Sequence, residues 1–203
     1  MIPVTFDHNL LIDLESKDEA TSEALRHLVS LHDTAQINIR VAAIGASERL
    51  KDKTYAPDFA AFQGRVRRLS QREFEILKPL GYWDITYWDW WIWGGEGTPE
   101  NELEQKIHTA LFPETEFKWQ DFAQASGVDH DQAVQSQSRE WQKWRNRKCD
   151  VLAMWCHIYY AGDAFITTDG HFHQATKKPA LISLGAKSIL YPSEVVSMVA
   201  GPK

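Results

Sequence analysis

Short apolar runs alternate with amphipathic stretches over the first fifty positions of the chain. Residues 2–6 form an apolar run typical of a buried strand, and residues 19–32 repeat their apolar positions at helical spacing. Apolar and polar residues alternate over positions 37–41, which predicts a second strand, and positions 42–50 then turn helical. Strands that alternate with helices favour an α/β fold with a doubly wound, mostly parallel central sheet flanked by helices.

The same alternation returns near the C-terminus. Apolar residues cover one broad helical side over positions 150–159, and Gly162 is a typical signal for the end of a helix. Residues 164–167 then predict a short buried strand. Residues 188–191 predict a last strand, and a terminal helix begins at Pro192. We therefore expect the two ends of the chain to build the sheet together.

The middle of the chain has a different pattern. From about residue 51 to about residue 138 the strand–helix alternation is lost, and helices are predicted over residues 58–69 and from Thr98 onward. Aromatic residues crowd positions 82–97, which end in glycines. We therefore predict one domain spanning residues 1–203, with a helical, tryptophan-rich insertion over roughly residues 51–138.

Charge and cysteine content limit the function classes. The formal net charge of −6 argues against a nucleic-acid footprint over the whole chain, although a local one is compatible with it. No apolar run has the length of a membrane span, and the N-terminus lacks the features of a signal peptide, so we expect no membrane contact. Cys149 and Cys156 stand on one predicted helix, too far apart to bridge, and a reducing cytoplasm is expected.

Four acidic residues follow the predicted strands or lie on the helices beside them. Asp7 and Asp169 come directly after strands, whereas Glu48 and Asp150 belong to flanking helices. Open α/β sheets form their sites beyond the carboxyl ends of the strands, so these acids should converge. Carboxylates gathered there repel one another unless a cation compensates them. Mg²⁺ or Mn²⁺ prefers oxygen ligands, and such an ion supports phosphodiester cleavage.

Several segments resemble PIN-domain nucleases, and they occur in the order of that family. The similar segments are residues 4–11, 39–48, 150–153, 165–172 and 188–194. They contain the opening strand with its aspartate and asparagine, the glutamate-bearing helix, the third and fourth acids, and the closing strand and helix. The resemblance covers roughly residues 1–50 and 145–200, and it implies a PIN-like form of the doubly wound fold.

The resemblance also implies an activity and a set of site residues. PIN-domain proteins are metal-dependent nucleases that usually hydrolyse single-stranded RNA and leave a 5′-phosphate and a 3′-hydroxyl. The catalytic and metal-binding residues would be Asp7, Glu48, Asp150 and Asp169. Asn9 and Thr168 would position a carboxylate, a water molecule or a phosphate by hydrogen bonding. Many small bacterial members are toxins, so an antitoxin-like protein partner is a further expectation.

One more acid and two histidines lie near these segments. Asp163 follows Gly162 and is chiefly predicted to be a turn residue, with a supporting place at the site as the alternative. His171 and His173 near Asp169 could bind phosphate or metal, but histidines in exposed loops are commoner. These residues therefore add little to the prediction of the site.

Basic residues ahead of Asp150 are the candidate contacts for the RNA backbone. They are Arg139, Lys143, Arg145, Arg147 and Lys148. Such a charge run is usually a solvated helix face, but its position next to the third acid favours phosphate contact. The tryptophans of residues 82–97 could stack unpaired bases, yet a core or subunit contact is the favoured interpretation. Homodimerisation is accordingly a further expectation.

Two alternatives to a Mg²⁺- or Mn²⁺-dependent endoribonuclease stay open. A PIN-like fold without turnover would act as an RNA- or protein-binding module. A metal-dependent phosphatase of another doubly wound fold would often use a nucleophilic aspartate with a second acid two residues later. Position 9, two residues after Asp7, is an asparagine. The nuclease is therefore the favoured prediction.

Overall fold

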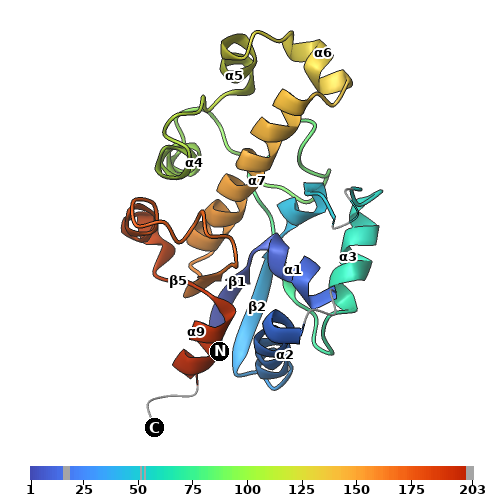
Figure 1. Ribbon diagram of the computed structural model, residues 1–203, viewed down its shortest axis with the longest axis vertical. Coiled ribbons are helices and arrows are strands. Elements are labelled where there is room, and N and C mark those ends of the chain that lie inside the picture. The colour runs from blue at the N-terminus through green and yellow to red at the C-terminus, as the bar shows by residue number, and fades with distance from the viewer. Residues whose placement is uncertain (16–18, 51, 53, 200–203) are drawn as a thin grey trace.

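A parallel β-sheet forms the centre of the molecule. The computed structural model describes residues 1–15, 19–50, 52 and 54–199. Its sheet has five strands in the order β3-β2-β1-β4-β5, and every neighbouring pair is parallel (Figure 1). The strands are β1 (Ile2–Phe6), β2 (Ile37–Ala42), β3 (Glu75–Leu77), β4 (Ala164–Ile166) and β5 (Ile189–Leu190). The predicted α/β class with a parallel sheet is confirmed.

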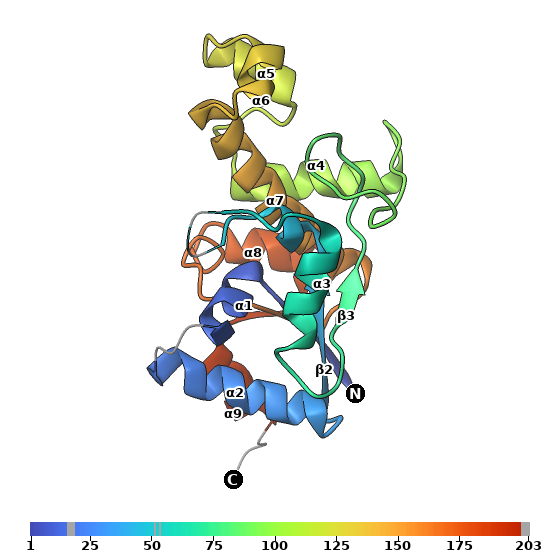
Figure 2. The ribbon, with the colours of Figure 1, turned by 90° about the vertical axis from the view of Figure 1, so that its right-hand side faces the viewer.

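Helices pack on both faces of this sheet. The helices on one face are α1 (His8–Glu15), α2 (Glu19–Asp33), α3 (Phe59–Arg67) and α9 (Pro192–Val199). The elements on the other face are α4 (Pro99–Leu111), α5 (Trp119–Ala125), α6 (His130–Gln135), α7 (Arg139–Tyr159), α8 (Lys178–Leu181) and the π-helical turn η2 (Ile182–Ala186). A 3-10 helix, η1 (Ala43–Ser47), follows β2 directly. Helices α5 and α6 lie at the end of the molecule farthest from α2 and α9 (Figure 2).

Two hydrophobic cores, one on each face, explain why the strands read as nearly continuous apolar runs. Val4 and Phe6 of β1 pack with the helices α1 to α3. Phe165 of β4 and Ile189 of β5 instead pack beneath α7. A parallel sheet covered on both faces needs apolar side chains in both directions, so strict alternation is lost.

Strand β3 corrects the prediction that residues 51–138 form a helical insertion. Helix α3 begins after Asp58, whose Oδ1 accepts a hydrogen bond from the Ala61 amide at 2.7 Å, and it carries the chain from β2 to β3. In β3, Ile76 lies opposite Val41 of β2. Three residues are too few to show a strand period, so the sequence pattern missed this edge strand. Within the predicted insertion, the part that follows β3, residues 78–138, adds no strand to the sheet.

Helix α7 is one continuous helix from Arg139 to Tyr159. The sequence predicts a helix over residues 131–148 that either runs on into the helix of Asp150 or bends near Asn146. The structure has the first alternative from Arg139 onward, because the 21 residues of α7 form one helix, whereas α6 is separate. The hydroxyl of Ser138 accepts a hydrogen bond from the Trp141 amide at 3.1 Å and so caps α7 at its start. Asp150 therefore lies in the middle of a helix that extends from α6 to the sheet.

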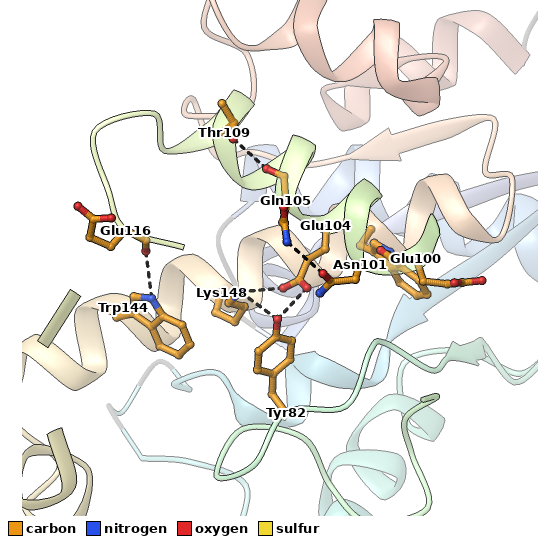
Figure 3. Close-up of polar contacts among 10 residues, drawn as sticks. Tyr82, Glu100, Asn101, Glu104, Gln105, Thr109, Glu116, Trp144 and Lys148 are labelled. Carbon is orange, nitrogen blue, oxygen red and sulfur yellow. Dashed lines mark hydrogen bonds and ion pairs between the residues drawn. The ribbon is translucent and has the colours of Figure 1, made fainter. Parts of the chain in front are cut away.

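A buried ion pair joins α7 to α4. The Lys148 Nζ lies 2.7 Å from the Glu104 Oε1, and their side chains are 1% and 0% exposed. The Tyr82 hydroxyl donates to the Glu104 Oε2 at 2.7 Å, which adds the segment after β3 to the same contact (Figure 3). Burial lowers the pKa of Lys148, whereas Glu104 acts to raise it. The prediction that Lys148 contacts RNA is therefore wrong, because its ammonium group is enclosed and paired.

Two further sequence predictions concern α7 and the membrane. Cys149 and Cys156 are both free and buried on α7, as their spacing predicted. In the portion of the chain that the structure describes, no helix combines the length and the apolar character needed to cross a membrane.

Removing one member of the buried pair should destabilise the protein strongly. Lys148→Met should lower the free energy of unfolding by about 3–5 kcal/mol, because it leaves the Glu104 carboxylate buried without a counter-charge. Replacing Glu104 by Leu in addition should recover most of that loss. Urea unfolding followed by far-ultraviolet circular dichroism measures both changes.

Lys143→Met on the exposed side of α7 is the matched control, with an expected change within about 0.5 kcal/mol. Equal losses in the single and double variants would contradict an electrostatic origin of the effect.

Candidate active site

The order of the strands opens a crevice between β1 and β4. The chain leaves β1 toward β2 on one side of the sheet and later returns to β4 on the other, so the connections diverge there. Ligand sites in open α/β sheets lie at such a switch point, beyond the carboxyl ends of the strands. Phe6 is opposite Ile166 in the register, and each is the last residue of its strand. Asp7 and Thr167 therefore emerge side by side at this edge.

The hydroxyl of Thr167 organises the polar groups at this edge. Its Oγ1 donates to the Asp7 Oδ2 at 2.6 Å. The same oxygen accepts from the Asn9 Nδ2 at 3.2 Å and from the Asp169 amide at 2.9 Å. The other carboxylate oxygen of Asp7, Oδ1, accepts from the His8 amide at 2.8 Å. One buried hydroxyl thus fixes the orientation of Asp7 and ties both strand ends together.

Two predicted supporting residues are not at this edge in the expected way. The Oγ1 of Thr168 donates to the Asp13 Oδ2 at 3.4 Å, whereas the hydroxyl that orients the Asp7 carboxylate belongs to Thr167. Asp163 precedes β4 and pairs with Lys187 at 2.5 Å, so it lies at the opposite end of that strand. The alternative that placed Asp163 at the site is therefore wrong, whereas the supporting role of Thr168 stays a prediction. Asn9, in contrast, does contact the Asp7–Thr167 pair.

Burial and mutual repulsion act on the acids together. Burial raises the pKa of Asp7 to about 6; the hydrogen bonds from Thr167 and His8 oppose the shift, and Asp169 adds to it. Burial, followed by repulsion from Asp7 and Asp150, raises the pKa of Glu48 well above its ordinary value. For Asp150 the causes are burial and then repulsion from Asp7 and Asp169. The fold thus links the four predicted acids, with Asp7 and Asp150 each interacting with the other three or being acted on by them.

The acids do not form a ready-made metal cage. Over residues 1–15, 19–50, 52 and 54–199, no three Asp, Glu, His or Cys side chains lie close enough to hold one ion together. Mg²⁺ is commonly held by one or two carboxylates, with water and substrate oxygens completing its shell. The donor set nevertheless suits a hard ion, because its side chains offer oxygen atoms. The buried Asn9 Oδ1 beside Asp7 also has no hydrogen-bond partner.

Cationic side chains surround the acids. Arg145 and then Arg65 act to lower the pKa of Glu48, and Arg147 and then Lys177 act to lower that of Asp150. Arg145 and Arg147 belong to the basic run on α7 that the sequence predicted. They only partly offset the burial and the repulsion, since the pKa values of both acids remain raised. The charged forms of both acids therefore stay disfavoured within this basic rim.

The remaining basic residues of α7 lie farther from the acids. Arg139 and Lys143 are exposed toward the start of the helix. Arg139 precedes Asp150 by eleven positions, which corresponds to about 16 Å along a helix. Both side chains are available to solvent and extend the basic rim along α7.

Sequence analysis missed two residues at this edge, Thr167 and Lys177. Thr167 carried a signal, because it is the first residue after its strand, as Asp7 is. Lys177 carried none, since turns after Asp169 bring it back toward the site. Its Nζ lies 2.8 Å from the Nε2 of His171, whose ring stacks on Phe112 with centroids 4.9 Å apart. His171 therefore supports a cation beside the acids.

Comparisons with protein-family models, with curated proteins and with solved structures find no match. The function of this edge is therefore argued from its own residues. Those residues are four repelling carboxylates, a threonine that orients one of them, and cations around them.

The raised pKa of Asp7 predicts that Asp7→Asn stabilises the protein more as pH rises, when both proteins have been treated with a chelator. Because the folded pKa of about 6 exceeds the ordinary 3.8, the favourable contribution of this carboxyl is complete below about pH 4. That contribution is lost as pH rises through about 6. The stability difference between Asp7→Asn and the unsubstituted protein should therefore shift toward the variant by up to about 3 kcal/mol between pH 4 and 8.

Urea titrations at each pH measure this difference. Asp163→Asn, in which the replaced acid lies at the other end of β4, serves as the control and should show no such shift. A difference that stays constant with pH would show that Asp7 is not held in a repulsive, buried environment.

Proposed function

We propose that this protein is a Mg²⁺- or Mn²⁺-dependent endoribonuclease of PIN-like type that hydrolyses phosphodiesters of single-stranded RNA. One observation carries the proposal: Asp7, Glu48, Asp150 and Asp169 interact electrostatically at the carboxyl edge of a parallel sheet, at its switch point. These acids come from four different parts of the chain. Such a convergence of uncompensated carboxylates suits the binding of a divalent ion.

The carboxylates would share the ion, with Asp7 and Asp169 at the strand ends and Glu48 and Asp150 beside them. When bound, the ion would lower the pKa of a water ligand and stabilise charge on the leaving oxygen. Thr167 holds the Asp7 carboxylate in one orientation through its 2.6 Å hydrogen bond. Thr167 also holds the start of the loop that carries Asp169. These residues therefore supply orientation, and no side-chain nucleophile is required.

The basic rim would bind the RNA backbone. Arg147 and Lys177 lie near Asp150, where they would contact the phosphate next to the cleaved bond. Arg139 and Lys143 extend the positive charge along α7, so a single strand would follow that helix. Lys148 takes no part, since it is paired with Glu104 inside the protein.

A silent binding module is the second candidate, and one observation favours it. No three described acidic, histidine or cysteine side chains are already grouped around one ion position. Calorimetric titration with Mn²⁺ separates the two candidates, because a silent site should show little affinity. The phosphatase alternative lacks such support, because the Nδ2 of Asn9 donates to Thr167 where that mechanism needs a second acid.

Loss of one central carboxylate should abolish cleavage. Asp169→Asn should reduce hydrolysis of a single-stranded RNA by about 10²-fold or more, because the charge that holds the ion is reduced. Chelation by EDTA should have the same effect, and added Mn²⁺ should restore activity only to the unsubstituted protein. Gel analysis of a labelled oligoribonucleotide measures the rates.

Asp163→Asn is the matched control and should cleave normally, because its carboxylate pairs with Lys187 away from the edge. Cleavage that survives both Asp169→Asn and EDTA would contradict the proposed mechanism.

The two neighbouring threonines should differ sharply. Thr167→Val removes the hydrogen bond that orients Asp7 while keeping the size of the side chain. It should therefore cost about 10–100-fold in activity or Mn²⁺ affinity. Thr168→Val should keep nearly the activity and Mn²⁺ affinity of the unsubstituted protein, because the Thr168 hydroxyl donates to Asp13 at 3.4 Å and Thr167 remains to orient Asp7. Equal effects at the two positions would disprove the role assigned to Thr167.

A further inference from the structure

The segment that connects β3 to α4 forms a tryptophan-lined cavity, and none of the four acids lines it. We name it the tryptophan pocket, and it measures about 370 Å³. Its aromatic walls are Trp83, Trp88, Trp91 and Trp93, and Asp84 also lines it. Three of these side chains are strongly exposed, with Trp83 at 81%, Trp88 at 68% and Trp93 at 81%. The cavity has the size of a typical ligand site.

The backbone around this pocket is held in place. The Gly81 amide donates to the Ile92 carbonyl at 3.0 Å, and the Ile92 amide donates to the Pro79 carbonyl at 2.9 Å. Trp91 packs directly on Gly81, where an added Cβ would lie 2.1 Å from its ring. The segment leaves β3 and reaches the start of α4 (Figure 2). A site whose backbone is already held in place loses less entropy when it binds a partner.

Other tryptophans, in the segment after β3 and on α7, have partners inside the protein. Trp90 stacks on Phe59 of α3 with ring centroids 4.3 Å apart. Trp141 and Trp144 of α7 are 3% and 4% exposed and pack with each other. Within residues 82–97, the predicted core role fits Trp90 and does not fit the exposed rings of the pocket, for which a subunit contact stays a prediction. Exposed aromatic groups gathered at one cavity mark an interaction site.

The charged side chains of the segment that forms the pocket are all acidic, and Asp84 is the charged residue among those that line it. The segment from Gly81 to Gly97 contains Asp84, Asp89 and Glu96 and has no lysine, arginine or histidine. Asp84 and Asp89 are exposed, and within the described chain neither forms an ion pair. Glu96 alone is paired, at 3.4 Å from Lys118. Unpaired carboxylates here would repel a phosphate group, whereas they would attract a cation.

We propose that the tryptophan pocket binds an arginine or lysine side chain of a protein partner. Indole rings attract cations more strongly than other aromatic side chains do, and Asp84 adds an opposite charge at the same cavity. RNA would instead follow the basic residues of α7. The inference does not depend on the nuclease activity, because the acids at the sheet edge do not line the pocket.

The probe is a blocked nonapeptide, acetyl-(Gly-Arg-Ser)₃-amide, and its citrulline counterpart is the uncharged control. Nuclear magnetic resonance of the indole N–H groups follows each titration. The arginine peptide should shift the signals of the pocket tryptophans in a saturable way and bind about tenfold more tightly than the citrulline peptide. Choline should bind more weakly than the peptide. Equal binding of both peptides, or tighter binding of choline, would overturn the proposal.

Two substitutions test the pocket itself. Trp88→Ala and Asp84→Asn should each lower the affinity for the arginine peptide by about tenfold, while Glu23→Gln on α2 should leave that affinity unchanged. Circular dichroism checks folding, which exposed side chains should not affect. Trp88-dependent binding of oligouridine or anionic vesicles in place of the peptide would overturn the proposal. So would Trp88-dependent self-association.

Asp169→Asn protein should bind the peptide normally. This result separates the pocket from the proposed cleavage site, because either can fail without the other.

Discussion

Mutual repulsion among carboxylates is the constraint on which the proposed function depends. Burial disfavours the charged forms of Asp7, Glu48 and Asp150, and repulsion among the acids, to which Asp169 contributes, adds to this effect. Neighbouring arginines and Lys177 offset only part of this cost. A fold keeps such an arrangement when another cation can complete it, and a divalent ion with substrate phosphate suits it. The nuclease proposal follows from this grouping of carboxyl groups whose ionisation a bound cation would favour.

The surrounding architecture keeps these groups in place. Helix α7 carries Asp150 in its middle, and two residues earlier Lys148 ties the helix to Glu104 of α4. Tyr82 joins the same pair from the start of the tryptophan-rich segment. The hydroxyl of Ser47, next to Glu48, donates to the Ile85 carbonyl in that segment. The acids and the tryptophan pocket are thus separate sites supported by one buried framework.

Sequence patterns predicted the parts of the protein that depend on local periodicity. The parallel sheet and most of its helices follow from the spacing of apolar residues. Asp7 and Asp169 were predicted because each follows a strand, whereas Glu48 was predicted from the family resemblance. Strand β3 was missed because three residues carry no period. Lys148 was misassigned because a basic residue in a charge run gives no sign of a buried partner 44 positions away. The neighbouring Thr167 and Thr168 point in different directions at the end of β4, and the sequence does not show which of them contacts Asp7.

Diffraction from crystals soaked in Mn²⁺ tests the central claim most directly, because anomalous scattering locates the ion without reference to activity. The account predicts an ion at the carboxyl edge of β1 and β4, about 2.1 Å from carboxylate oxygens that include those of Asp7 or Asp169. The same soak of Asp7→Asn crystals should show reduced occupancy. An edge that stays empty in saturating Mn²⁺, or an ion bound only elsewhere, would contradict the account.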